Sequence, residues 1–366
     1  MPAIQALAAS LREPFDPATA VPLEMEICGQ LREQGVGPLV HRALRARRLL
    51  DAQPSGVREE LGRLTREEAL LEPFRQAEAA RVIAVLAAAG VRALVFKGAA
   101  LAYVCYPEPG LRPRLDTDLL IRRADLKAAA SVFERLGCTR AAGTSGELVT
   151  HQMTYISPRH GLQIAFDVHW KLSNPQPFAD LFSFEELERE SVPLTALGPA
   201  ARTLCDAHAL LAACVHRVAH HYGRDILIYL YDIDLLARRL SGEGWRAVVS
   251  NAESKRICQV TRSGLERASS LFGTVVPGLV TRALTDAPDA EPTAAFLADG
   301  FRKFDILRAD LRQLSWLRRL TLLREHLFPA PAFVLRSYQK TSPVLLPFLY
   351  FARIICGATA WFRPLR

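Results

Sequence analysis

Two aspartates separated by a single residue, Asp116 and Asp118, are the first candidates for chemistry in this chain. They begin the run DTDLLI, residues 116–121, whose apolar residues predict a β-strand. Side chains alternate along a strand, so both carboxylates face the same way, with Cα atoms about 7 Å apart. Two carboxylates on one face repel each other unless solvent or a cation neutralises them. The pattern predicts either a cation site or a solvated strand end with capping aspartates.

Two more features favour the cation site. A third carboxylate, Asp167, lies in another β-prone run, LQIAFDVHW, residues 162–170. The strand predicted over 92–97 ends at Lys97-Gly98, and a glycine turn at a helix start can present backbone N–H groups to a phosphate. Three carboxylates on adjacent strands can hold two divalent cations about 3.5–4 Å apart, an arrangement that serves phosphoryl transfer.

The elements that must position these residues form a small mixed α/β core with helices before and after it. Strands are predicted over 92–97, 116–121, 150–156 and 162–170, and helices over 99–105 and 124–136. Before the core, a capping-box pattern predicts a helix that begins at Thr65 and stops near Gly90. The predicted class is α+β. The predicted divisions are an N-terminal helical region (1–90), the core (91–175), a larger helical domain (176–342) and a basic, apolar C-terminal segment (343–366).

Charge is distributed unevenly along the 366 residues. The net charge is +8, but residues 301–366 alone carry +9 and residues 1–300 sum to −1, so we expect no stable nucleic-acid binding. The seven cysteines include no CxxC pair, which argues against a zinc ribbon or a disulfide framework. The first residues do not resemble a signal peptide, so a cytoplasmic location is expected.

The C-terminal segment raises the question of a membrane. Residues 343–362 are about as long as a membrane span, but Pro347 and Arg353 interrupt the apolar run. A docked or interfacial helix is therefore favoured over a spanning one. Peripheral membrane contact through residues 343–366 is the expectation.

Three segments of the chain resemble a known family. KGAALAYVCYPEPGLRPRLDTDLLI, FDVHW and HRVAHHYGRDILIYLYDID, in this order, resemble the nucleotidyltransferases of the polymerase-beta superfamily, and among them an uncharacterised bacterial branch. The resemblance covers roughly residues 85–240. It implies the fold of that superfamily and transfer of a nucleoside monophosphate from a nucleoside triphosphate such as ATP to an unknown acceptor hydroxyl or phosphate. It also implies Mg²⁺, or Mn²⁺ in its place, as the cofactor.

The resemblance assigns roles to the three aspartates. Asp116 and Asp118 match the residues that bind the metal and the triphosphate. Asp167 matches the carboxylate that holds the catalytic metal and helps to deprotonate the acceptor. All three are thus candidate catalytic and metal-binding residues.

The candidate nucleotide-binding residues are Lys97, Gly98, Ala99, Arg112 and Arg114. The superfamily usually has Gly-Gly or Gly-Ser where this chain has Gly98-Ala99, so the serine that touches the triphosphate is absent here. Lys97 could supply a compensating positive charge. Arg112 and Arg114 either bind phosphate or act as surface cations that balance the aspartates.

Histidines provide further candidates for substrate or interdomain contact. His216 and His220 are four residues apart on a predicted helix, a spacing that can chelate zinc, but the residue after His216 is Arg instead of the Glu of a metalloprotease motif. In the resembled branch they match a His-x-x-x-His feature and Asp232 matches an aspartate on the next helix, which predicts a contact between His220 and Asp232. His169 shares a strand face with Asp167, where it either touches the metal site or fills a gap.

Two other functions compete with nucleotidyl transfer. A glycosyltransferase could use Asp-x-Asp to bind a nucleotide sugar through a metal, although such enzymes usually place several strands before that motif and here only one precedes it. A catalytically degenerate nucleotidyltransferase fold could bind a nucleotide or a protein, including at a membrane surface. The missing serine favours the degenerate fold, and the presence of all three aspartates opposes it.

Overall fold

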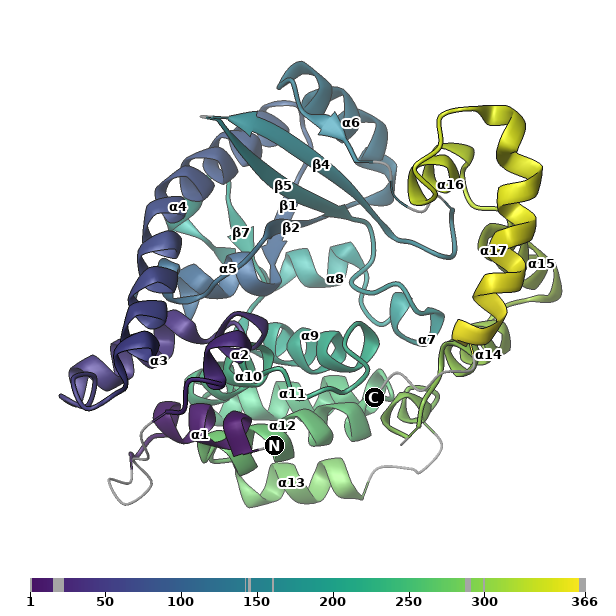
Figure 1. Ribbon diagram of the computed structural model, residues 1–366. Helices are drawn as coiled ribbons and strands as arrows, with labels where there is room; N and C mark the ends of the chain where they lie inside the picture. Colours follow the sequence, from purple (N-terminus) through teal and green to yellow (C-terminus); the bar gives the residue numbers. More distant parts are fainter. Residues whose placement is uncertain are drawn as a thin grey trace.

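The protein combines one mixed β-sheet with helices on both of its faces, as Figure 1 shows for the computed structural model. The structure describes residues 2–15, 23–141, 143, 146–159, 161–286, 291–298 and 300–361. The α+β class expected from the sequence is confirmed.

The sheet has the strand order β3-β4-β5-β2-β1-β7-β6 within the described residues. The strands are β1 (Ala93–Phe96), β2 (Asp116–Ile121), β3 (Thr139–Arg140), β4 (Gln152–Arg159), β5 (Leu162–His169), β6 (Val192–Pro193) and β7 (Arg202–Thr203). β2 is parallel to β5 and β1 is parallel to β7, while the other neighbouring strands are antiparallel. The four strands predicted from the sequence are present, and the sequence analysis missed the two-residue strands β3, β6 and β7.

Both faces of the sheet are covered, which explains why β1 is apolar along its whole length. Ala93 and Val95 belong to a core shared with α4 (Ser55–Ala88) and α6 (Leu126–Arg135). Leu94 and Phe96 point the other way, into a larger core shared with the helices that follow the sheet. Alternating side chains can enter two cores only when the strand lies between two layers. The sheet is therefore the middle layer of the molecule.

The N-terminal helices precede the sheet. They are α1 (Pro2–Leu11), α2 (Ile27–Glu33), α3 (Gly37–Ala46) and α4. α4 begins at Ser55 and continues through Pro73, so the prediction of a helix start at Thr65 is wrong. The Thr65 hydroxyl instead donates to the Leu61 carbonyl oxygen at 2.8 Å, a bond that threonine makes in the interior of a helix.

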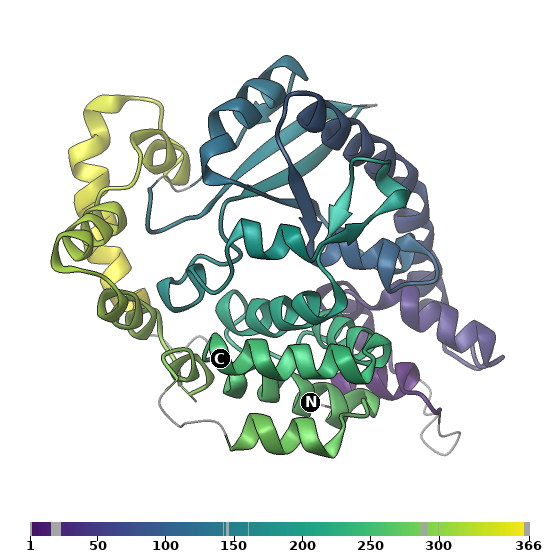
Figure 2. The same cartoon turned by 180° about the vertical axis from the view of Figure 1, so that it is seen from behind.

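A helical layer lies below the sheet in Figure 1, and the reverse view in Figure 2 shows the same arrangement. Its helices are α7 (Gln176–Ala179), α8 (Phe184–Arg189), α9 (Asp206–Ala219), α10 (Leu227–Arg239), α11 (Gly242–Ser254), α12 (Cys258–Phe272) and α13 (Gly278–Thr285). α5 (Lys97–Val104), which follows β1 directly, contacts α9. One hydrophobic core joins α1–α3 to α9–α13, so the N-terminal helices pack on the helical layer as well as on α4.

Residues 302–361, here called the C-terminal lobe, form the last part of the fold. The lobe contains α14 (Lys303–Gln313), α15 (Trp316–Leu327), α16 (Pro331–Ser337) and α17 (Leu346–Trp361). Figures 1 and 2 place it on the side of the molecule away from α3 and α4. Across the described residues, no helix has both the length and the apolar character needed to cross a membrane. Short 3₁₀ helices occur at Pro109–Leu111, Arg123–Asp125, Thr195–Leu197, Ala294–Leu297 and Pro343–Leu345.

Candidate active site

The three aspartates singled out in the sequence lie on one face of the sheet. β2 and β5 pair in parallel with Asp118 opposite Asp167, and Asp116 is two residues before Asp118 on the same face. That face points towards the helical layer, because Leu120, the next residue on it, belongs to the core that contains the α9 side chains. The carboxylates therefore meet between the sheet and the helical layer.

Asp118 is the buried centre of a charged hydrogen-bond cluster. Its Oδ1 lies 2.7 Å from Lys97 Nζ and 2.8 Å from His169 Nε2. Burial alone would raise the pKa of Asp118, but Lys97 and His169 outweigh it and hold that pKa well below its usual range. Burial and the charge of Lys97 lower the pKa of His169, so we assign a neutral imidazole that donates Nε2–H to Asp118. Of the two roles expected for His169, contact with the acidic site is the one the geometry shows.

Asp167 is held by two side chains of the neighbouring strand β4. Gln152 Nε2 donates to its Oδ2 at 2.8 Å, and Thr154 Oγ1 donates to its Oδ1 at 2.6 Å. These bonds fix the orientation of the carboxylate, and each oxygen retains a lone pair for a further ligand.

Asp116 lies in an environment that favours its protonated form. Burial, together with the negative charges of Asp118 and Asp167, raises the pKa of Asp116 to about 7, against an ordinary value of 3.8. Lys97 and Arg112 lower this pKa, but by less. Negative charge thus exceeds positive charge around Asp116, which is the condition that attracts a cation.

The residues present fit a divalent cation. Carboxylate oxygens of Asp118 and Asp167 lie within 4.8 Å of each other. Carboxylate oxygens are the ligands that Mg²⁺ and Mn²⁺ prefer, and Asp116 offers a third carboxylate on the same face.

The turn from β1 into α5 brings Lys97 to Asp118 in a strained conformation. Lys97 has φ 53°, in the left-handed region that residues with a Cβ avoid. Gly98 follows, and a Cβ there would lie 3.2 Å from the guanidinium of Arg112. The absence of a Cβ at Gly98 thus lets the guanidinium of Arg112 lie against the backbone of the turn. Ala99 is buried and offers no hydroxyl.

Arg112 is a buried partner of Asp232 on α10. Its Nη2 donates to Asp232 Oδ2 at 2.7 Å, its Nε donates to Oδ1 at 3.0 Å, and the Tyr106 hydroxyl donates to the same Oδ1 at 2.6 Å. Asp232 therefore binds Arg112 and Tyr106 in place of the predicted contact with His220, whose Nε2 has no hydrogen-bond partner. The pair joins the loop before β2 to the helical layer.

Arg114 is also buried and also paired. Its guanidinium binds both carboxylate oxygens of Glu72 on α4, at 2.7 and 2.8 Å, and donates to the Tyr103 hydroxyl at 3.1 Å. The alternative that Arg112 and Arg114 are surface cations is therefore wrong, since they are only 5% and 7% exposed and bind other carboxylates. Through these ion pairs Arg112 and Arg114 hold in place the segment that leads into Asp116.

Three histidines and one tyrosine of the helical layer face the acidic cluster. These residues, here called the histidine wall, are His216, His220, His221 and Tyr229. His216 Nε2 lies 3.2 Å from His221 Nε2, and the His221 ring stacks on Tyr229 with centroids 4.4 Å apart. Burial and Lys97 lower the pKa of His220 to about 3, so its imidazole is neutral. His216 Nδ1 and His220 Nε2 are buried without a hydrogen-bond partner. Among the described residues, the groups able to hold a metal do not include either histidine, so the zinc alternative gains no third ligand.

Several residues of the site were not predicted. They are Gln152, Thr154, Tyr106, His221 and Tyr229. His221 and Tyr229 lie in the segment HRVAHHYGRDILIYLYDID, whose family resemblance was the signal that could have identified them. Gln152 and Thr154 alternate along a predicted strand, but their partner became evident only from the pairing of β4 with β5.

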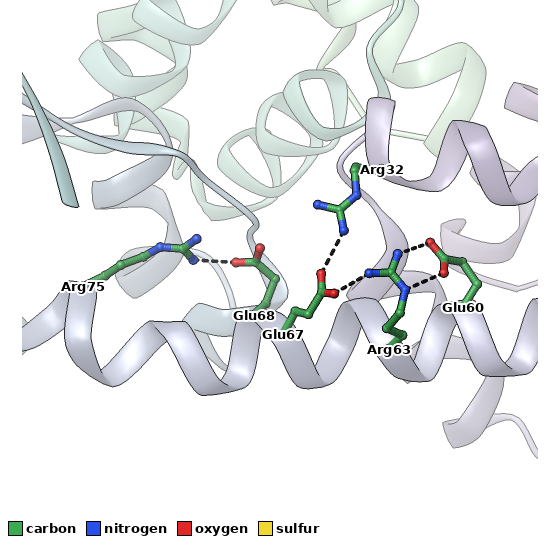
Figure 3. Close-up of polar contacts among 6 residues, drawn as sticks. All are labelled: Arg32, Glu60, Arg63, Glu67, Glu68 and Arg75. Carbon is green, nitrogen blue, oxygen red and sulfur yellow. Dashed lines mark hydrogen bonds and ion pairs between the residues drawn. The ribbon is translucent and has the colours of Figure 1, made fainter. Parts of the chain in front are cut away.

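The acidic cluster and the histidine wall line one cleft of about 660 Å³. This volume is in the range of small-molecule sites. At its edge Arg32 on α2 donates to Glu67 on α4 at 2.8 Å, and Arg75 donates to Glu68 within α4 at 2.5 Å (Figure 3). Among the described lining residues, Lys97 is the Lys or Arg side chain that forms an ion pair with one of the three aspartates.

The fold and the cleft define a class of protein in which a mixed sheet presents carboxylates to a helical layer. Within this class the chain belongs to the family described as uncharacterised nucleotidyltransferase, which it matches over residues 26–273. No curated protein matches the chain. The matched region runs from α2 to the end of α12 and does not include the C-terminal lobe.

Proposed function

We propose that the protein transfers a nucleoside monophosphate from a nucleoside triphosphate to an acceptor. The acceptor oxygen attacks the α-phosphorus, the bond to the β-phosphate oxygen breaks, and pyrophosphate leaves. The observation that carries this proposal is the placement of Asp116, Asp118 and Asp167 on one face of adjacent parallel strands inside a cleft. The family to which the chain belongs supports the reaction class.

The three aspartates would hold a divalent cation, Mg²⁺ or Mn²⁺. Such a cation, when bound, neutralises phosphate charge and stabilises the negative charge that develops during transfer. His169 fixes the rotamer of Asp118 through its 2.8 Å bond, and Gln152 and Thr154 fix that of Asp167. This support matters because catalysis of phosphoryl transfer depends mainly on positioning.

The turn at Lys97 and Gly98 would receive the phosphates. Lys97 provides the positive charge, and the first backbone N–H groups of α5 point out of the helix N-terminus. Ala99 provides no hydroxyl, so charge and backbone donors replace the side-chain contact usual in the superfamily. In this proposal Arg112 and Arg114 hold the turn in place through Asp232 and Glu72 instead of binding phosphate directly.

Asp167 would accept the proton of the acceptor hydroxyl. It is less enclosed by cations than Asp118, because its two hydrogen-bond donors are the neutral groups of Gln152 and Thr154.

A second candidate function is nucleotide binding without transfer. The observation in its favour is the ion pair between Lys97 and Asp118, which already neutralises one of the metal-binding carboxylates, together with the missing hydroxyl at Ala99. A protein of this kind would bind a triphosphate and release no pyrophosphate.

Thermal unfolding with each nucleoside triphosphate, with and without Mg²⁺, tests both candidates when combined with a pyrophosphate-release assay. We expect Mg²⁺-dependent stabilisation that is lost in Asp116→Asn/Asp118→Asn. The matched control is Asp51→Asn, because the Asp51 side chain is fully exposed. Stabilisation without pyrophosphate release, with a panel of sugar, peptide and RNA acceptors, would favour the binding function. No stabilisation of the folded protein by any triphosphate would overturn both.

A further inference from the structure

The C-terminal lobe presents an apolar helix face that nothing in the described structure covers. On α17, Phe348, Phe351 and Ile355 are 73%, 67% and 55% exposed, and their spacing places them on one side of the helix. Val344, just before the helix, is 79% exposed. Large apolar side chains gathered on one surface usually indicate an interaction site.

The opposite side of α17 is fixed to the rest of the lobe. The Tyr350 hydroxyl donates to the Pro329 carbonyl oxygen at 2.7 Å. The guanidinium of Arg353 lies 5.7 Å from the centre of the Phe333 ring, on α16. Since these contacts set the rotation of the helix about its axis, the apolar side chains point outwards as a consequence of how the lobe packs.

The charges of the lobe are sorted between its surface and its interior. Asp310 and Glu325 are buried: Asp310 accepts a hydrogen bond from the Gln176 backbone N–H, and Glu325 accepts bonds from the backbone N–H groups of residues 147–149. The third carboxylate, Asp305, caps the start of α14 by accepting from the Arg302 N–H. The exposed basic residues are Arg302, Lys303, Arg308, Arg312, Arg318, Arg319, Arg324, Arg336 and Lys340. The surface of the lobe is thus basic, while Asp310 attaches it to α7 and Glu325 attaches it to the segment before β4.

We propose that the C-terminal lobe docks on an anionic membrane surface, with the apolar face of α17 inserted between lipid headgroups. Apolar side chains and a basic surface are the two signals that together give stable peripheral binding. α17 has 16 residues, fewer than the roughly 20 needed to cross a bilayer, so it would lie in the interface.

Charge and apolar exposure together favour lipid over other occupants. RNA would pair with the basic residues and could stack bases on Phe348 and Phe351, but it would leave the aliphatic side chains of Val344 and Ile355 exposed to water. A second copy of the chain would bring a lobe of the same positive charge against this one, which opposes association. The surface therefore fits a layer of negative headgroups above hydrocarbon.

Co-sedimentation of the full-length protein with vesicles tests the proposal. One set of vesicles is phosphatidylcholine alone, and the other contains about 30% phosphatidylglycerol to give an anionic surface. We expect binding to the anionic vesicles that weakens as salt rises from about 0.1 to about 0.5 M. Phe348→Glu/Phe351→Glu should weaken binding at least about tenfold, and Arg318→Gln/Arg336→Gln should weaken binding several-fold and make its remaining loss with salt shallower.

The matched control carries the same chemical change on a different exposed surface. Val275 and Leu279 are 84% and 81% exposed near α13, and Val275→Glu/Leu279→Glu should bind vesicles like the unchanged protein. Equal unfolding temperatures of the two double variants would show that both fold. The proposal is overturned if the unchanged protein ignores anionic vesicles, or if both glutamate variants bind equally well. Self-association, or binding to RNA, that replaces vesicle binding would also overturn it.

Discussion

Lys97 Nζ lies 2.7 Å from Asp118 Oδ1, so an ammonium group sits where a metal-binding carboxylate would meet its cation. The lysine reaches this position from a backbone with φ 53°, and strain of this kind is typical of functional sites. A cation held by Asp118 would compete with Lys97 for this carboxylate, because the two positive charges repel each other when both lie beside it. We therefore expect Lys97 to weaken metal binding and to strengthen phosphate binding.

Lys97→Met should separate these effects. Without nucleotide, removal of the ammonium should raise the affinity for Mn²⁺ about tenfold, or about 1.4 kcal/mol, because the competing charge is gone. Affinity for the triphosphate should fall by a similar factor. Isothermal titration of Mn²⁺, and then of nucleotide at saturating Mn²⁺, measures both. Lys97→Arg is the control, since it keeps the charge. Weaker Mn²⁺ binding by Lys97→Met would contradict the competition.

Gly98→Ala should disturb the turn through Arg112. The new Cβ would lie 3.2 Å from the guanidinium, which is itself held by Asp232 and has little freedom to move. We expect a loss of about 1–3 kcal/mol in the free energy of unfolding, as for overpacked cores. Chemical denaturation provides the measurement. Gly29→Ala is the control, because Gly29 is inside α2 with no atom within 4 Å of its Cβ position, and it should gain about 0.5–1 kcal/mol.

The part of the site that could be predicted follows from local rules. Alternation along a strand places Asp116 and Asp118 on one face without any knowledge of the fold. The position of Asp167 required more, since only the parallel pairing of β2 with β5 brings it opposite Asp118. Pairing between strands far apart in the chain has no local signal, and here the family resemblance supplied the order of the motifs.

The partners of the site could not be predicted because they are distant in sequence. Arg112 and Asp232 are 120 residues apart, and Arg114 pairs with Glu72 on a helix that precedes the sheet. The sequence left Arg112 and Arg114 either as phosphate ligands or as surface cations, and their burial excludes only the surface location. The sequence analysis also interpreted residues 176–342 as a helical domain, and so missed β6 and β7, which have only two residues each; β7 extends the sheet by pairing with β1, and β6 pairs with β7.

The buried pair of Arg112 and Asp232 should contribute to folding more than any exposed ion pair. Asp232→Ala leaves the guanidinium buried without its carboxylate and the Tyr106 hydroxyl without its acceptor. The expected loss in the free energy of unfolding is about 3–5 kcal/mol. Asp206→Ala breaks the partly exposed pair with Arg239 and should cost less than about 1 kcal/mol. Similar losses in the free energy of unfolding for both variants, measured by urea denaturation, would show that breaking the buried pair costs no more than breaking the partly exposed one.

The raised pKa of Asp116 predicts how stability depends on pH without metal. The folded protein prefers the protonated carboxyl, so the stability that Asp116 contributes is complete below its ordinary pKa of 3.8 and is lost as pH rises through about 7. Asp116→Asn should therefore be more stable than the unchanged protein above pH 7, by up to about 4 kcal/mol at 1.36 kcal/mol per pKa unit. Denaturation in chelator from about pH 5 to pH 9 measures this difference. Equal stabilities at pH 8 would contradict the prediction.

Asp310 should show the same dependence on pH but no dependence on metal. Burial raises the pKa of Asp310 to about 7, although the hydrogen bond from the Gln176 backbone N–H lowers it. Asp310→Asn keeps that acceptor, so it should exceed the unchanged protein in stability above pH 7. If the proposed site binds Mg²⁺, saturating Mg²⁺ should favour the ionised form of Asp116 and reverse the sign of the Asp116→Asn difference at pH 8, while the Asp310→Asn difference should not change. If Mg²⁺ changed both differences equally, its effect would not arise at the aspartate cluster.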